Sequence, residues 1–168
     1  MFMNENPEAA LDEQATDMLV QRIAWVRALH LWFQGAHHVV RGTSFAGDHV
    51  SLYERIYTAN QDEVDGATEK VIGLTGDEAV ACPKLLAARA LEIMEEYPSP
   101  VGLNPQELAR TGLQLEQDYI VFVEGLFHDL EEAEMMSIGL NDQLSASANA
   151  HETFVYLLGQ RARDESSR

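Results

Sequence analysis

The sequence has 168 residues and is strongly acidic, with 28 Asp and Glu against 11 Lys and Arg and a formal net charge of -17. Proteins that bind nucleic-acid phosphates depend on clusters of Lys and Arg, so this balance argues against that class of function. The length fits a single domain over residues 1–168 with a substantial core. Within it we expect the polar residues 1–8 to be a frayed N-terminal tail.

The sequence shows no sign of a membrane segment or of a disulfide framework. No apolar run approaches the length of a membrane span and no signal-peptide pattern precedes Met18, so we expect a cytoplasmic protein. Cys82 is the only cysteine, which excludes an intrachain disulfide and a Cys-based zinc site. We expect the Cys82 side chain to act as a buried small apolar group.

Apolar residues recur at helical spacing from about residue 11 to residue 33, which predicts a first helix with His30 near its end. Residues 35–47 follow as a long segment rich in Gly and His, which we interpret as a loop. The adjacent His37 and His38 are interpreted as exposed loop residues, with metal binding as the alternative.

A second helix is predicted from about residue 48 to residue 74, where Pro is absent and Asp48 can cap the start. Glu54, Asp65 and Glu69 are separated by 11 and 4 residues. At about 100° per residue these three positions fall within about 60° of one another, so three carboxylates share one helix face.

The spacing along the helix axis limits what this acidic face can bind. Asp65 and Glu69 lie one turn apart, about 6 Å, which allows them to share one cation. Glu54 lies about 16 Å from Asp65, so one ion cannot bind both within a chain. An antiparallel copy related by a two-fold axis could bring Glu54 of one chain to Asp65 and Glu69 of the other. The alternative is a solvated helix face.

Two upstream histidines, His30 and His49, strengthen the metal hypothesis, although a lone His on an apolar face is more often a core residue. Mixed imidazole and carboxylate ligands suit iron(II), manganese or zinc.

Three more helices complete the prediction. A short helix is expected over residues 83–97, with Pro83 in its first turn and Pro98 and Pro100 after it. A third long helix is expected from an N-cap at Asn104 to about Met136, and a fourth over residues 142–163. No strand-like alternation of apolar residues is present.

The motifs resemble those of the Dps family, the miniferritins or DNA-binding proteins from starved cells. In that family H-W-N-x-x-G ends the first helix, F-x-x-x-H follows, and the second helix carries E and then D-x-x-x-E. This chain keeps the His30 to Gly35 spacing, the Phe45 to His49 spacing, and an acidic helix from Tyr53 to Glu69. The resemblance spans most of the chain.

The resemblance implies an all-α, ferritin-like four-helix bundle with a short extra helix in the crossover between the second and third helices. Ferritins and di-iron oxygenases with a metal centre inside one bundle use Glu-x-x-His pairs. The sequence contains no Glu followed three residues later by His. That absence argues against an intrasubunit centre and favours a shared one.

The sequence departs from the family pattern at three places. The Trp that follows the first His is displaced by one, to Trp32, and about seven extra residues separate Gly35 from Phe45. His49 is also one residue further from Glu54 than the family spacing. Its neighbour Asp48 could therefore replace it as a ligand.

By resemblance, the protein would oxidise iron(II), with peroxide or oxygen as acceptor, and store the ferric mineral in a hollow homo-oligomer, a dodecamer. His30, His49 and Glu54 of one subunit and Asp65 and Glu69 of its two-fold mate would bind iron, or zinc or manganese in its place. Acids such as Asp142 and Glu134 would line pores. The alternative is a non-catalytic ferritin-like cage whose site is vestigial or holds zinc. Neither membrane binding nor direct DNA binding is expected.

Overall fold

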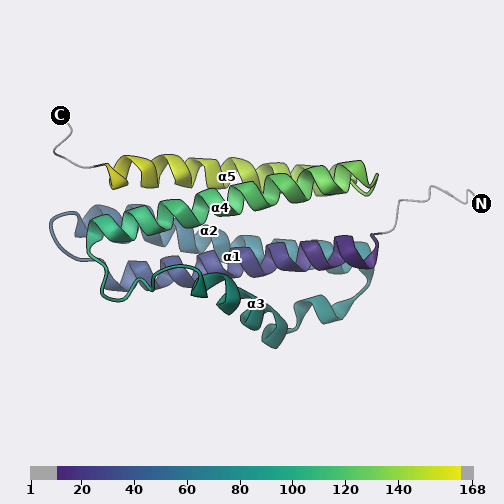
Figure 1. Ribbon diagram of the computed structural model, residues 1–168, viewed down its shortest axis with the longest axis horizontal. Coiled ribbons are helices and arrows are strands. Elements are labelled where there is room, and N and C mark those ends of the chain that lie inside the picture. The colour runs from purple at the N-terminus through teal and green to yellow at the C-terminus, as the bar shows by residue number, and fades with distance from the viewer. Residues whose placement is uncertain (1–10, 164–168) are drawn as a thin grey trace, which may run out of the picture.

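The structure is a computed structural model and describes residues 11–163, so the tail predicted over residues 1–8 lies outside the described residues. Four long helices form the bundle: α1 (Glu13–Val39), α2 (Arg55–Thr75), α4 (Pro105–Glu132) and α5 (Ile138–Ala162). The short helix α3 (Pro83–Glu95) follows a 3-10 turn (Glu78–Ala81) and lies outside the bundle against α1 (Figure 1). This arrangement confirms the all-α, ferritin-like bundle with an extra helix between the second and third long helices.

Side-chain caps fix where three of the long helices begin. Asp12 accepts a hydrogen bond from the Ala15 amide at 2.7 Å, and Asn104 forms a reciprocal capping box with Glu107. Ser137 accepts from the Leu140 amide at 3.1 Å, and for this reason α5 begins at residue 138 rather than near residue 142 as predicted.

The loop predicted over residues 35–47 is much shorter, because α1 continues to Val39 and the chain is helical again from Phe45. Gly35 does not end the helix but admits a neighbour: a Cβ built on it would lie 2.8 Å from Cγ of Pro100. Ala36 and Val40 are buried beyond it. Gly35, which we expected at the end of the first helix, therefore lies inside it. Its missing side chain lets Pro100 of the α3–α4 connection pack against the helix.

The second long helix begins as a π-helix, η1 (Gly47–Glu54), which continues into α2. In a π-helix each hydrogen bond joins residues five apart, rather than four as in an α-helix. The additional residue between His49 and Glu54, relative to the family spacing, therefore fits into η1 without breaking the helix, and the two side chains lie about one turn apart. Asp48 does not cap this helix, contrary to prediction. Its carboxylate accepts hydrogen bonds from Arg161 Nε at 2.8 and 2.9 Å and from Ser44 Oγ at 2.7 Å.

Apolar side chains from α1, α2, α4 and α5 fill the centre of the bundle, and Trp32 donates its indole N–H to the Pro98 carbonyl at 2.9 Å. Cys82 is exposed, so the prediction of a buried thiol is wrong. Among residues 11–163, no helix has the length and apolar character needed to cross a membrane.

Candidate metal site

The acidic face of α2 is accessible, as a metal site requires. Asp65 and Glu69 are exposed, and Glu54 is half-buried at the end of η1. Within the described part of the chain, none of these three carboxylates forms a hydrogen bond or an ion pair. They are therefore free to accept a ligand from solution or from another chain.

His30 is held in the form that binds metals. It is 6% exposed, and its Nδ1 lies 3.1 Å from the Tyr57 carbonyl oxygen. A carbonyl can only accept, so Nδ1 carries the hydrogen and the neutral ring presents an Nε2 lone pair. Burial lowers the pKa of His30, the Tyr57 hydrogen bond opposes this, and the charge of Arg27 adds to the lowering. The ring is thus kept neutral, as a ligand must be.

His49 has a partner that the sequence did not reveal. Its ring stacks on His37 with centroids 3.7 Å apart, and each ring donates Nδ1–H to the other's main-chain carbonyl, at 2.8 and 2.9 Å. Phe45 stacks on His49 at 4.7 Å. His37 is buried, so its interpretation as an exposed loop residue is wrong, whereas His38 is exposed as expected.

The two predicted histidine ligands lie at different levels of the hairpin formed by α1 and α2. His37, which contacts His49, is seven residues beyond His30, about 10 Å along the helix. The Tyr57 ring contacts both, with centroids 6.0 Å from His30 and 5.2 Å from His37. Taken over residues 11–163 of a single chain, no group of three or more His, Cys, Asp or Glu side chains is arranged to hold a metal ion.

Asp48, the alternative ligand to His49, already has hydrogen-bond partners. It is 4% exposed, and both its oxygens are bonded to Arg161. A metal would have to displace this ion pair, in which Asp48 is buried and Arg161 half-buried, to reach the carboxylate. The geometry therefore favours His49 over Asp48.

A groove of about 430 Å³ lies between α1, α2 and α3, with Asp65 on its rim. Its walls combine apolar side chains, among them Leu31, Val64 and Leu86, with the charged Arg27.

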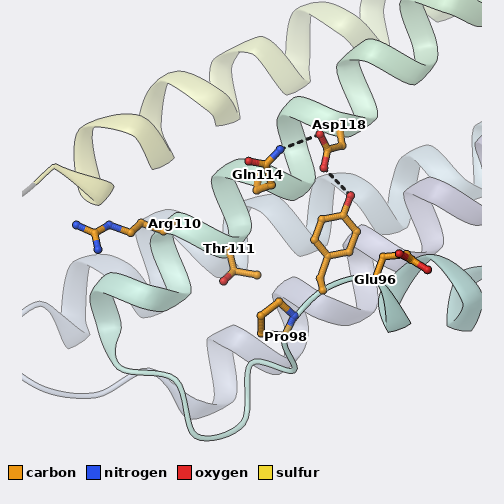
Figure 2. A pocket seen from close by; sticks show the side chains of 7 residues that line it. Glu96, Pro98, Arg110, Thr111, Gln114 and Asp118 are labelled. Atoms are coloured by element: carbon orange, nitrogen blue, oxygen red, sulfur yellow. Dashed lines mark hydrogen bonds between the residues drawn. The ribbon is translucent and has the colours of Figure 1, made fainter.

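A second pocket, of about 680 Å³, lies between the end of α3 and α4 and contains none of the predicted ligands. There Asp118 accepts hydrogen bonds from Tyr97 at 2.7 Å and Gln114 at 2.8 Å (Figure 2), so its carboxylate is already satisfied.

The sequence analysis missed a polar cluster inside the bundle, to which each long helix contributes one charged or ionisable acid or base: Arg22, Glu63, Glu116 and His151. The hydroxyl of Tyr119, also from α4, hydrogen-bonds to Arg22 and Glu63 in the same cluster. The signal was present, because Arg22 and Glu116 lie on the apolar stripes of their helices. A search for Glu-x-x-His could not detect residues spread over four helices.

Opposing effects set the pKa values in this cluster. Burial alone would raise the pKa of Glu63, but His151, Arg22 and Ser147 outweigh it and lower the pKa to about 2. Burial would lower the pKa of His151, but the carboxylates of Glu116 and Glu63 raise it to about 9. Burial raises the pKa of Glu116. A charged Arg22–Glu63 pair therefore lies beside a pair that retains its proton.

Comparison with known proteins finds similarity in structure but not in sequence. No protein-family model and no curated protein matches the chain. Solved structures do match, among them three of Dps proteins. That of Mycobacterium smegmatis gives a TM-score of 0.73 at 16% identity, covering 92% of this chain and 90% of the other.

The Dps of Microbacterium arborescens, described as in the high iron form, gives 0.71 at 19% identity and covers 92% and 94% of the two chains. The Dps of Vibrio cholerae, described as a member of a broad superfamily of ferritin-like diiron-carboxylate proteins, gives 0.72 at 16% identity and covers 90% of each. The chain therefore has the ferritin-like fold of these Dps proteins over nearly its whole length.

Proposed function

We propose that the protein is a miniferritin, which binds iron(II), oxidises it with peroxide or oxygen, and stores the ferric product in a homo-oligomeric shell, a dodecamer by resemblance. The observation that carries the proposal is the Asp65–Glu69 pair: two exposed, unpartnered carboxylates one turn apart, beside a groove, on a chain with the Dps fold. One of the similar structures is itself described as a high iron form.

The ligands would come from two chains. His30, His49 and Glu54 would be contributed by one subunit, and Asp65 and Glu69 by its two-fold mate, because Glu54 and Asp65 lie about 16 Å apart along one helix. The groove beside Asp65 offers the mate an apolar surface to pack against. The carboxylates would neutralise the bound cation and His30 would offer Nε2, while the electrons come from the iron, which is the substrate. Zinc or manganese would compete for the same donors.

Iron would reach the site along acidic surfaces. Glu134 and Asp142 are exposed at the connection between α4 and α5. Carboxylates gathered around an opening would raise the local concentration of cations. We propose these two residues as pore acids.

The acidic chain would act without binding DNA directly. Arg161, one of the few cations near the C-terminus, is paired with Asp48 and is not available to a phosphate. With a net charge of -17 per chain, salt would screen repulsion without creating attraction. A gel shift with plasmid at low salt without divalent metal should show no retardation, and retardation at micromolar protein would refute this part of the proposal.

The test of iron oxidation is an anaerobic iron(II) titration followed by peroxide, monitored by ferric absorbance. Asp65→Ala and Glu69→Ala should each slow oxidation by at least about tenfold, because each removes a charged ligand. Asp62→Ala is the matched control, since Asp62 is an exposed carboxylate on the same helix outside the proposed ligand set. Ligand variants that oxidise iron as fast as the control would exclude this assignment.

A non-catalytic cage is the second candidate, and the stacking of His49 on His37 favours it. A ring that is already packed on both faces is less free to move toward an ion. Metal analysis of protein purified without chelators distinguishes the two functions. Bound zinc that resists exchange, with no iron turnover, would favour the cage.

A further inference from the structure

The polar cluster inside the bundle contains a proton that its geometry requires. Glu63 of α2 is its centre: Oε1 accepts hydrogen bonds from Arg22 Nη2 at 2.6 Å and Ser147 Oγ at 2.6 Å, and Oε2 lies 3.1 Å from His151 Nε2. Because an ionised carboxylate can only accept, the Nε2 hydrogen of His151 is donated to Glu63. The remaining ring nitrogen, Nδ1, faces α4.

His151 Nδ1 lies 2.5 Å from Oε2 of Glu116, and both side chains are fully buried. If both groups lacked a proton at this position, two lone pairs would face each other at hydrogen-bond distance. One proton must therefore lie between them, either on an imidazolium facing a carboxylate or on a carboxylic acid facing a neutral imidazole. Both descriptions place the same single proton at the same contact.

Charge counting shows why a proton suits this position better than a metal ion. Arg22 and Glu63 cancel, and the His151–Glu116 pair with one proton is neutral. Removing that proton would leave one uncompensated negative charge in the core. Replacing it with a divalent cation would leave one uncompensated positive charge, and either state is costly in a buried site.

Among residues 11–163, the other groups around His151 cannot take up this imbalance. Arg22 is the charged neighbour from α1 and Glu63 the one from α2. Tyr119 of α4, whose ring centroid is 4.3 Å from that of His151, has a pKa raised by burial and stays neutral. Oε1 of Glu116 has no hydrogen-bond partner within residues 11–163, so nothing there stabilises a second charge on the carboxylate.

We propose that the His151–Glu116 pair is a proton lock, one buried proton that holds α5 to α4 and, through Glu63, to α2, and whose loss at alkaline pH loosens the bundle. The proposal is independent of iron and of the subunit interface. The folded-state pKa of His151, about 9, is above the ordinary value of 6.5. The stabilisation is therefore fully present below about pH 6.5 and is lost as the pH rises through about 9.

Urea unfolding between pH 6 and pH 10 tests the proton lock. In the wild type, the unfolding equilibrium constant should rise by up to about tenfold per pH unit between pH 7 and pH 9, the slope for one proton retained only by the folded state. In Glu116→Gln the amide can donate to Nδ1 of a neutral His151, so no buried proton is left to lose and this slope should disappear. Equal slopes in the two proteins would overturn the proposal.

The matched control is Glu131→Gln, which changes an exposed His–Glu pair in which Nδ1 of His128 lies 3.7 Å from Oε2 of Glu131. It should keep the wild-type slope. If Glu116→Gln does not fold, proton NMR of the wild type still decides the question. A far-downfield resonance coupled to Nδ1 of His151 should be present at pH 7 and vanish above about pH 9, and its absence at pH 7 would overturn the proposal.

A metal titration separates a proton site from a metal site. Zinc added to Asp65→Ala/Glu69→Ala protein, which lacks the proposed interface ligands, should leave the downfield resonance unchanged. Stoichiometric zinc binding that removes the resonance, and that Glu116→Gln abolishes, would show that this position takes a metal and would contradict the proton lock.

Discussion

We expect the stability of the fold to depend strongly on the charge of Glu63. Its carboxylate neutralises Arg22, which is 1% exposed, while also accepting hydrogen bonds from α5. Glu63→Gln would leave the Arg22 guanidinium buried without a counter-charge. We expect a loss of stability on the order of 3–5 kcal/mol, measured by urea unfolding at pH 7.

The control for that prediction is Asp17→Asn, which removes the anion from the Asp17–Arg89 pair. That pair is as short, at 2.5 Å, but the Asp17 side chain is 62% exposed. Solvent screening reduces such a pair to less than about 1 kcal/mol. Equal losses in the two variants would show that the buried Arg22–Glu63 pair stabilises the fold no more than an exposed pair does.

The same carboxylate predicts behaviour in acid. The pKa of Glu63 falls to about 2 in the folded protein, below the ordinary value of 4.5. Its contribution to stability is therefore present above about pH 4.5 and is lost as the pH falls toward 2. Unfolding measured from pH 5 to pH 2 should show a steeper loss in the wild type than in Glu63→Gln, and parallel curves would exclude the effect.

Single elements show where inference from sequence succeeded and where it could not. The apolar spacing of the first helix, the cap at Asn104 and the proline-rich connection after α3 are local signals, so the number and order of the helices could be predicted. The continuation of α1 past Gly35 depends on Pro100, 65 residues away in sequence, and the insertion in η1 depends on hydrogen bonding that composition does not encode. The cluster around Glu63 forms only when four helices pack together, so no local pattern in the sequence predicts it.

Two glycines within α4 should respond oppositely to the same substitution. A Cβ on Gly112 would lie 2.8 Å from Cε1 of the buried Phe33, whereas a Cβ on Gly125 would meet nothing within 4 Å. Gly112→Ala should destabilise by about 1–3 kcal/mol through overpacking. Gly125→Ala should stabilise by roughly 0.5–1 kcal/mol because alanine favours the helix. Thermal unfolding of both variants gives the signs, and a stabilising Gly112→Ala would show that Phe33 can move aside.

Across the whole molecule, the predicted ligands are not gathered into one group that could hold a metal ion within residues 11–163. Asp65 and Glu69 are exposed and unpartnered in the described structure, His30 presents Nε2 from a buried position, and His49 is stacked on His37. These placements leave the ligand assignment a prediction. The types of the candidate ligands and their spacing are visible in the sequence. The stacking of His37 on His49 could not be predicted, because it depends on how α1 and η1 pack together.

Each proposed iron site would combine residues from two chains, and assemblies mixed from two inactive variants distinguish this arrangement from a site within one chain. His30→Ala/Glu54→Ala lacks one half of the site and Asp65→Ala/Glu69→Ala lacks the other. Each variant alone should fail to oxidise iron. After unfolding and refolding a 1:1 mixture, random pairing across a two-fold axis should restore about a quarter of the sites, and of the wild-type rate. A mixture that stays as inactive as its components, although both variants assemble together, would contradict the shared site.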